Sequence, residues 1–385
     1  MYRVANNDAK RSVGRAKRLA WQEWSDDLHT TEGQQKMYRL AKQMRRDRKD
    51  VLGSNFIKDE NGAIKIDSAE AVDRWKRYFH QLLNEETEYS IEETYPVQGL
   101  LEQITSVEVV AALESMKDRK AAGPTEVTSE LIKYVGGQGV DYLTEVFQGI
   151  AREGRPPIEW GMSITVPLYK GVGDALECGK YRGLRLLEHG MKIWEKVLLQ
   201  RLRAIVNVSE QQFGFQKGRS TTDAIFILRQ LQEKYCRKKR PLYHIFVDME
   251  KAFDRVPRPV IEWALRKQSV MALYSCSSSK VRFAGVDSVD FPIGVGVHQG
   301  SALSPLLFVL VIEEASKSCR RGHPWELLYA DDIVLTADSK ERVEEMFRSW
   351  REALLSKGLK VNLAKATEEV ITSGRYPCAV CGSGV

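Results

Sequence analysis

A pair of adjacent carboxylates, Asp331 and Asp332, lies between two short apolar runs and constrains this chain more than any other feature. Runs of this length are typical of strands, and Asp favours tight turns, so residues 327–335 predict a β-hairpin with both carboxylates at its tip. Two carboxylates ~4 Å apart repel by roughly 4 kcal/mol at an effective dielectric of 20. Water at an exposed turn can relieve that repulsion, so an ordinary solvated turn is one interpretation.

A second apolar run, residues 244–248, also ends in a carboxylate, that of Asp248. If the two strand ends meet, Asp248 and Asp331 share a pocket whose negative charge needs divalent cations. Oxygen ligands of this kind suit Mg²⁺, which keeps several waters and takes one or two carboxylates together with phosphate oxygens. Two such ions are the usual machinery for in-line displacement at phosphorus. The pattern therefore predicts a site for two Mg²⁺ ions that serves phosphoryl transfer.

Length and composition limit the class of protein without naming an activity. A chain of 385 residues, 43% hydrophobic and 29% charged, is long enough for more than one structural unit and has an ordinary globular composition. Residues 1–50 hold 13 Lys/Arg against 7 Asp/Glu, so their excess of +6 equals the net charge of the whole chain. This placement favours an anionic partner, although a solvated basic helix explains it equally well.

The sequence shows no sign of a membrane or secretory protein. Its longest unbroken apolar run, residues 306–312, is far too short to span a bilayer, and its first residues lack an apolar signal-peptide core. Six scattered cysteines do not form a disulfide framework, so we expect an intracellular protein of the nucleus or cytoplasm. Cys378 and Cys381 have the spacing of zinc ligands, but a closed site needs four. We expect two free thiols there, or the start of a truncated zinc module.

The remaining hydrophobic patterns predict an α+β fold, because strands and helices do not alternate regularly. Apolar residues at helical spacing predict helices over residues 69–83, 189–205, 306–318 and 343–354. We expect strands at 164–169 and 359–363, a loop at 170–185, and hairpins at 56–66 and 280–297. The acidic stretch 84–93 predicts a linker, which places a first domain boundary near residue 100.

Five motifs carry a family resemblance, and they occupy residues 181–187, 212–220, 248–254, 299–305 and 329–332. In this order and spacing they resemble the reverse transcriptases of non-LTR (LINE-like) retrotransposons, in particular the RTE branch, over about residues 1–375. The resemblance implies right-hand polymerase fingers and palm at 101–375, after a basic, mostly helical N-terminal extension at 1–100. It also makes residues 376–385 the start of a truncated zinc module. The family's thumb would lie beyond residue 375, so we expect it to be largely missing.

The resemblance implies an RNA-directed DNA polymerase that adds dNTPs to the 3′-hydroxyl of a DNA primer on an RNA template. Asp248 and Asp331 would hold two Mg²⁺ ions, with Asp332 beside them as a third catalytic carboxylate. Phosphoryl transfer asks mainly for charge and positioning, so few other groups would be needed. The alternative is a catalytically inactive retroelement remnant that binds nucleic acid non-specifically through its basic helices.

By the same resemblance, several further residues would contact the nucleotide. Arg182, Arg185 and Arg219 would clamp the triphosphate, since an Arg fork binds phosphate oxygens bidentately; each is otherwise a solvated loop cation. Phe253 would lie under the sugar and exclude a 2′-hydroxyl, which argues against a ribonucleotide polymerase. Without the resemblance, Phe253 is an ordinary core residue. Lys365 would lie near the triphosphate, or it is a surface lysine.

Two short loops also bear on the resemblance, one by matching the family and one by departing from it. Gln299 and Gly300 would let the backbone approach the nascent base pair, because Gly permits close contact. The alternative is a simple turn before a capped helix. Where the family usually carries Gly-Pro-Asp-Gly, residues 123–126 of this chain have the sequence Gly-Pro-Thr-Glu, so we expect that loop to lose its usual turn.

Overall fold

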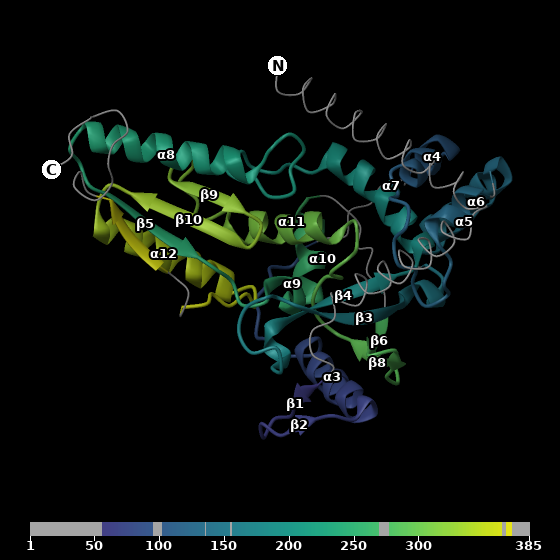
Figure 1. The fold of residues 1–385 in the computed structure, drawn as a ribbon. Helices are drawn as coiled ribbons and strands as arrows, with labels where there is room; N and C mark the ends of the chain where they lie inside the picture. The colour runs from purple at the N-terminus through teal and green to yellow at the C-terminus, as the bar shows by residue number, and fades with distance from the viewer. Residues whose placement is uncertain are drawn as a thin grey trace, which may run out of the picture.

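The computed structural model describes residues 56–94, 102–134, 136–154, 156–268, 277–363 and 367–371. Within these ranges, helices and mostly antiparallel sheets mix without regular alternation, which confirms the α+β class (Figure 1). The basic segment 1–50, Lys365, Cys378 and Cys381 lie outside the described residues. None of the described helices is long and apolar enough to cross a membrane.

The predicted carboxylate hairpin belongs to a four-stranded antiparallel sheet, which we call the central sheet. The strand order is β11 (Thr367–Ile371), β5 (Leu242–Val247), β10 (Asp332–Ala337) and β9 (Glu326–Tyr329). Ile333 of β10 lies opposite Val247 of β5, so the end of β5 lies beside the β9–β10 turn. Both predicted strands are thus confirmed. The prediction of a strand at 359–363 is wrong, because Val361 forms only an isolated bridge with Met249.

Three helices enclose the largest hydrophobic cluster together with this sheet. They are α10 (Arg258–Lys267), α11 (Ser304–Ser316) and α12 (Lys340–Leu355). The buried residues of this cluster include Phe308 of α11, Leu335 of β10 and Trp350 of α12. Helix α11 is apolar on nearly all sides, as expected for a helix in the middle of a core. A further long helix, α8 (Thr221–Arg237), runs alongside the sheet and contacts β9 (Figure 1).

A second sheet contains strands that precede β5 in the sequence and strands that follow it. Its path is β4 (Tyr181–Leu187), β3 (Met162–Tyr169), β6 (Ser277–Phe283) and β7 (Val286–Asp287), and β8 (Phe291–Ile293) also pairs with β6. The hairpin expected at 280–297 is confirmed in β6 and β7. The loop expected at 170–185 is wrong over its last part, because residues 181–185 belong to β4 and pair with β3.

Helix α3 (Ser68–Leu82) packs against this second sheet. Asp67 caps it by accepting hydrogen bonds from the amides of Ala69 and Glu70. Its aromatic side chains Trp75 and Phe79 join Tyr181 and Phe283 in a buried cluster, into which the hairpin of β1 (Ile57–Lys58) and β2 (Ile64–Lys65) inserts Ile57. The hairpin and the helix expected before residue 84 are therefore both confirmed.

The third cluster is formed mainly by helices. It consists of α4 (Ser106–Glu114), α5 (Ser129–Tyr134), α6 (Gly136–Glu153) and α7 (His189–Ile205), the last with the bounds expected from its apolar stripe. An ion pair joins Arg201 of α7 to Glu108 of α4, with 2.6 Å between Nε and Oε1. The short helices η1 (Ile158–Gly161), η2 (Cys178–Lys180) and α9 (Ala252–Arg255) complete the described elements.

The loop at residues 123–126 keeps its turn, contrary to our expectation. The amide of Glu126 donates to Gly123 O at 3.1 Å, and Glu126 itself adopts φ 62°. Thr125 donates from its amide and from Oγ1 to the carboxylate of Glu188, at 2.7 and 2.6 Å. A Cβ on Gly123 would lie 2.7 Å from the Glu188 amide, so glycine is required there. The Thr125–Glu188 contact therefore fixes the loop without the usual residues.

Candidate active site

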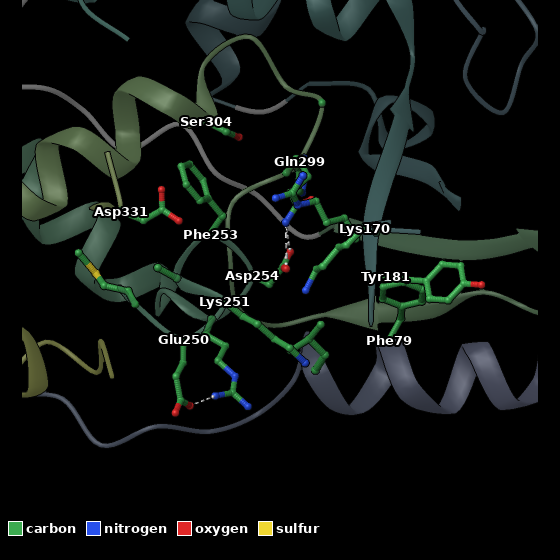
Figure 2. A pocket seen from close by; sticks show the side chains of 18 of the residues that line it. Phe79, Lys170, Tyr181, Glu250, Lys251, Phe253, Asp254, Gln299, Ser304 and Asp331 are labelled. Carbon is green, nitrogen blue, oxygen red and sulfur yellow. Dashed lines mark hydrogen bonds and ion pairs between the residues drawn. The ribbon is translucent and has the colours of Figure 1, made fainter. Parts of the chain in front are cut away.

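A cleft of about 790 Å³ opens between the two larger sheets (Figure 2). Its walls come from α3, β4, α9, the end of β5, the loop before α11 and the β9–β10 turn. Six of the predicted site residues line it: Arg182, Asp248, Phe253, Gln299, Gly300 and Asp331. Segments far apart in the sequence therefore meet around one space.

The catalytic carboxylates predicted from the sequence lie at one end of the central sheet. The β9–β10 turn consists of Ala330 and Asp331, and Ala330 adopts φ 59°, a positive value that suits the twist of a two-residue hairpin. Asp248 follows β5 directly, and both Asp248 and Asp331 are half-buried in the wall of the cleft. Asp332 is the first residue of β10; its side chain is exposed and does not line the cleft.

The donor set fits a metal ion that is completed by its substrate. The described residues contain no group of three or more His, Cys, Asp or Glu side chains that could hold a metal ion by themselves. Asp248 and Asp331 do bring two carboxylates into one cleft, and the carboxamide of Asn362 donates to Asp248 at 3.5 Å. Mg²⁺ is commonly bound by one or two carboxylates, waters and substrate phosphates. The pair therefore suits Mg²⁺ bound jointly with a nucleotide.

Gln299 and Gly300 are fixed against strand β4 and helix α9. Gln299 O accepts from the Arg185 amide at 2.8 Å, and Gln299 Nε2 donates to both oxygens of Asp254, at 3.0 and 2.9 Å (Figure 2). Gly300 adopts φ 118°, and a Cβ there would lie 2.5 Å from Arg185 O. Burial raises the pKa of Asp254, against the opposing charges of Arg185 and Lys251. This part of the cleft is thus tightly held.

A second buried carboxylate supports the same loop from behind. Glu195 of α7 accepts from Ser301 Oγ at 2.7 Å and from the Ala302 amide at 2.9 Å. Burial raises its pKa to about 7, although both hydrogen bonds and the charge of Lys192 act in the opposite direction. Sequence reasoning missed Asp254 and Glu195. Asp254 lies within a quoted motif and offered a signal, whereas Glu195 in an amphipathic helix offered none.

The three predicted arginines occupy different environments. Arg182 is exposed on β4 and lines the cleft. Arg185 is only 2% exposed and lies beside Asp254, outside the cleft lining. Arg219 lies with its guanidinium 5.2 Å from the centre of the Phe213 ring and donates to Glu210 O. Lys170, Lys251 and Arg255 also line the cleft, and sequence reasoning assigned none of them a role.

Phe253 combines the two roles considered for it. It lines the cleft, and it also packs on the central core by stacking on Phe308 of α11, with 4.3 Å between ring centroids. The ring of Phe215 meets it edge-on, with 6.4 Å between centroids. The aromatic side chain is therefore held from two sides while one part of it faces the cleft.

Helix α3 forms a wall that the sequence did not predict. Lys251 Nζ donates to Tyr78 OH at 2.8 Å and lies 5.0 Å from the centre of its ring. Burial raises the pKa of Tyr78 to about 12 and lowers that of Lys251. Gly183 of β4 makes room for Phe79, since a Cβ there would lie 2.6 Å from the Phe79 ring. These contacts join α3 to both sheets at the cleft.

Two carboxylates at the ends of neighbouring antiparallel strands, facing a cleft with several cations, define the palm of a nucleotidyl-transferring polymerase. The family model for "Reverse transcriptase (RNA-dependent DNA polymerase)" matches residues 170–376, more than half of the chain. The chain therefore belongs to the reverse transcriptase family.

Curated relatives agree with this assignment. The chain is 27% identical over 277 residues to "Probable RNA-directed DNA polymerase from transposon BS" of Drosophila melanogaster, covering 66% of this chain and 30% of the relative. It is 25% identical over 300 residues to "RNA-directed DNA polymerase from mobile element jockey" of the same species, covering 71% and 33%.

A further relative, "Retrovirus-related Pol polyprotein from type-1 retrotransposable element R1" of Bradysia coprophila, is 24% identical over 364 residues, covering 90% and 35%. The resemblance to non-LTR reverse transcriptases is thus confirmed. The chain spans about a third of the length of the curated relatives that it matches.

Proposed function

We propose that this chain is an RNA-directed DNA polymerase that extends a DNA primer on an RNA template with dNTPs, and that it belongs to the RTE branch. The observation that carries the proposal is the position of Asp248 and Asp331 at the ends of neighbouring strands, in the wall of one cleft. The polymerase names of its relatives support the same reaction. RNA and dNTPs as substrates also agree with the intracellular location expected from the cysteines.

The roles follow from the positions of the side chains. Asp248 and Asp331, with the exposed Asp332 next to them in the chain, would hold two Mg²⁺ ions, which when bound would activate the primer 3′-hydroxyl and neutralise the leaving pyrophosphate. Arg182 and Lys170, which also line the cleft, would supply positive charge for the triphosphate. Arg185 and Arg219 would contribute at a longer range, and Lys365 stays a prediction.

Base and sugar recognition fall to the other side chains of the cleft. Phe253 offers a flat ring, backed by Phe308, where a deoxyribose can lie and a 2′-hydroxyl would be excluded. The Arg185 amide holds the backbone of Gln299 and Asp254 holds its side chain, and the backbone of Gln299 and Gly300 would contact the nascent base pair. The cleft is thereby suited to deoxynucleotides paired with a template.

Primer extension on an RNA template with dNTPs and Mg²⁺ tests the proposal. Asp331→Asn removes one charge from the carboxylate pair, and we expect the rate to fall by about 10³-fold or more. Asp338→Asn, which neutralises an exposed carboxylate just beyond β10, is the matched control and should retain the wild-type rate. Equal rates for wild type and Asp331→Asn would reject the assigned chemistry.

The same proteins distinguish the inactive-remnant alternative. If wild type does not extend the primer but binds an RNA–DNA duplex with an affinity that falls steeply with salt, counterion release accounts for the binding and the chain acts as a nucleic-acid-binding remnant. Binding that is insensitive to salt would count against that alternative as well.

A further inference from the structure

The motif at residues 212–220 reaches the carboxylate turn through backbone pairing at the edge of β9. The Leu328 amide donates to Gln211 O at 2.9 Å, and the Phe213 amide donates to Leu328 O at 2.8 Å. Gln212 and Leu328 form a parallel bridge between these two bonds. The segment 211–213 therefore acts as a short additional strand beside the one that leads into Ala330.

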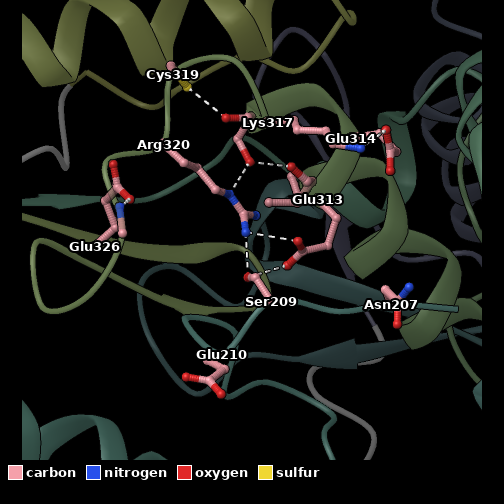
Figure 3. A network of polar contacts seen from close by, with 12 residues as sticks. Asn207, Ser209, Glu210, Glu313, Glu314, Lys317, Cys319, Arg320 and Glu326 are labelled. Atoms are coloured by element: carbon pink, nitrogen blue, oxygen red, sulfur yellow. Dashed lines mark hydrogen bonds and ion pairs between the residues drawn. The ribbon is translucent and has the colours of Figure 1, made fainter.

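The beginning of this segment is anchored to helix α11 by a polar network (Figure 3). Ser209 Oγ donates to Glu313 Oε1 at 2.9 Å, and Arg320 Nη1 donates to Glu313 Oε2 at 2.8 Å. Arg320 Nε also donates to Ser316 Oγ at 2.9 Å. The segment thus has a fixed support on its N-terminal side.

The side chain of Gln212 ties the segment to the turn itself. Gln212 is completely buried, and its Oε1 accepts from the Ala330 amide at 3.1 Å and from the Gly214 amide at 2.8 Å. One side-chain oxygen therefore satisfies a main-chain donor on each of the two segments. Buried main-chain amides need such partners, so this oxygen has a specific structural task.

Gly214 brings the two backbones into direct contact. A Cβ on Gly214 would lie 2.5 Å from the Ala330 amide nitrogen and 3.0 Å from Tyr329 C. Ala330 adopts φ 59°, a conformation that a residue other than glycine keeps only where its surroundings enforce it. Gln212 and Gly214 supply those surroundings on the side away from the cleft.

We propose that Gln212 is a positioning residue for the polymerase reaction: through the Ala330 amide it sets the turn that carries Asp331 relative to Asp248. The inference rests on the proposed function. Gln212 does not line the cleft, so its loss removes no substrate contact and acts only through the geometry of the turn. The expected signature is a lower kcat with a nearly unchanged KM for dNTP, and a higher Mg²⁺ concentration for half-maximal rate.

Two substitutions separate the hydrogen bond from the volume of the side chain. Gln212→Leu keeps a similar size and removes the acceptor, and we expect kcat to fall about 10- to 100-fold, as for a displacement of the order of 1 Å at a reacting group. Gln212→Glu keeps an acceptor oxygen, and because complete burial favours the neutral carboxyl, it should restore most of that loss at a pH where the carboxyl is protonated. Gln211→Leu is the matched control, because only the main chain of Gln211 pairs with β9, and it should leave kcat unchanged.

Amide hydrogen exchange provides a readout that does not depend on activity. In Gln212→Leu the Ala330 amide should exchange faster, while the Leu328 amide, bonded to Gln211 O, stays protected. Loss of protection at both amides, or a kcat equal to that of Gln211→Leu, would overturn the positioning role. If wild type does not extend primers at all, the proposed function fails, whereas a selective change at Ala330 would still support the contact.

Discussion

The buried carboxylate of Glu195 makes a quantitative prediction about the loop that carries Gln299. Burial raises its pKa from 4.5 to about 7. One pKa unit corresponds to about 1.4 kcal/mol, so the shift amounts to about 3 kcal/mol. Because the folded state binds this proton more tightly than the unfolded chain, the stabilising contribution is fully present below pH 4.5. It is lost as the pH rises through about 7.

Glu195→Gln tests this value, since an amide of the same shape does not titrate. The variant has one acceptor fewer for Ser301 and Ala302, which sets a constant offset of about 1–3 kcal/mol in the free energy of unfolding. On top of that offset, the variant should gain about 3 kcal/mol relative to wild type between pH 4.5 and about 7.5. Urea unfolding at several pH values and one ionic strength measures the difference.

The same titration with Glu145→Gln, an exposed position on α6, controls for the removal of one charge. A difference between Glu195→Gln and wild type that stays constant across this pH range would refute the reasoning. It would mean that folding does not raise the pKa of Glu195, so that its side chain is not buried against Ser301 and the loop is held in another way.

Three other perturbations have defined outcomes. Glu126→Gly should raise the free energy of unfolding, measured in urea, by about 1 kcal/mol, because glycine adopts φ 62° without strain. A decrease would show that the backbone of Glu126 is not strained. Burial lowers the pKa of His244 to about 4, so the folded state disfavours its protonation. Its contribution to the free energy of unfolding is therefore present above pH 6.5, and about 3 kcal/mol is lost as the pH falls toward 4. If His244→Gln shows the same loss of stability in acid as wild type, this reasoning is wrong. Phe253→Ala should increase ribonucleotide incorporation in primer extension, and Phe215→Ala should do so to a smaller extent because it touches only the ring edge. Unaltered discrimination in Phe253→Ala would eliminate the sugar gate.

The sequence predicted those parts of the fold whose signals are local. The hairpin around Asp331 and the helix 189–205 each have an apolar period that identifies them without knowledge of their neighbours. The meeting of Asp248 with Asp331 required only that two strands pair at the right ends, and the register of Val247 with Ile333 satisfies that condition.

Contacts between distant segments could not be predicted in the same way. Nothing in the composition of helix α7 shows that Glu195 meets Ser301, because that contact depends on how a helical cluster packs beside a sheet. The case of Arg182 and Arg185 is different. Residues three apart in a strand point to opposite faces, so recognising β4 as a strand would have shown that the two arginines cannot both face the cleft.

The position of helix α3 has a practical consequence for cloning. The family match begins at residue 170, whereas α3 and strand β3 both precede it. A recombinant fragment cut at that boundary would uncover the rings of Tyr181 and Phe283, which lie 4.8 and 5.8 Å from Trp75 in the intact chain. Such a surface favours aggregation. Recombinant fragments of this chain should therefore start upstream of β1.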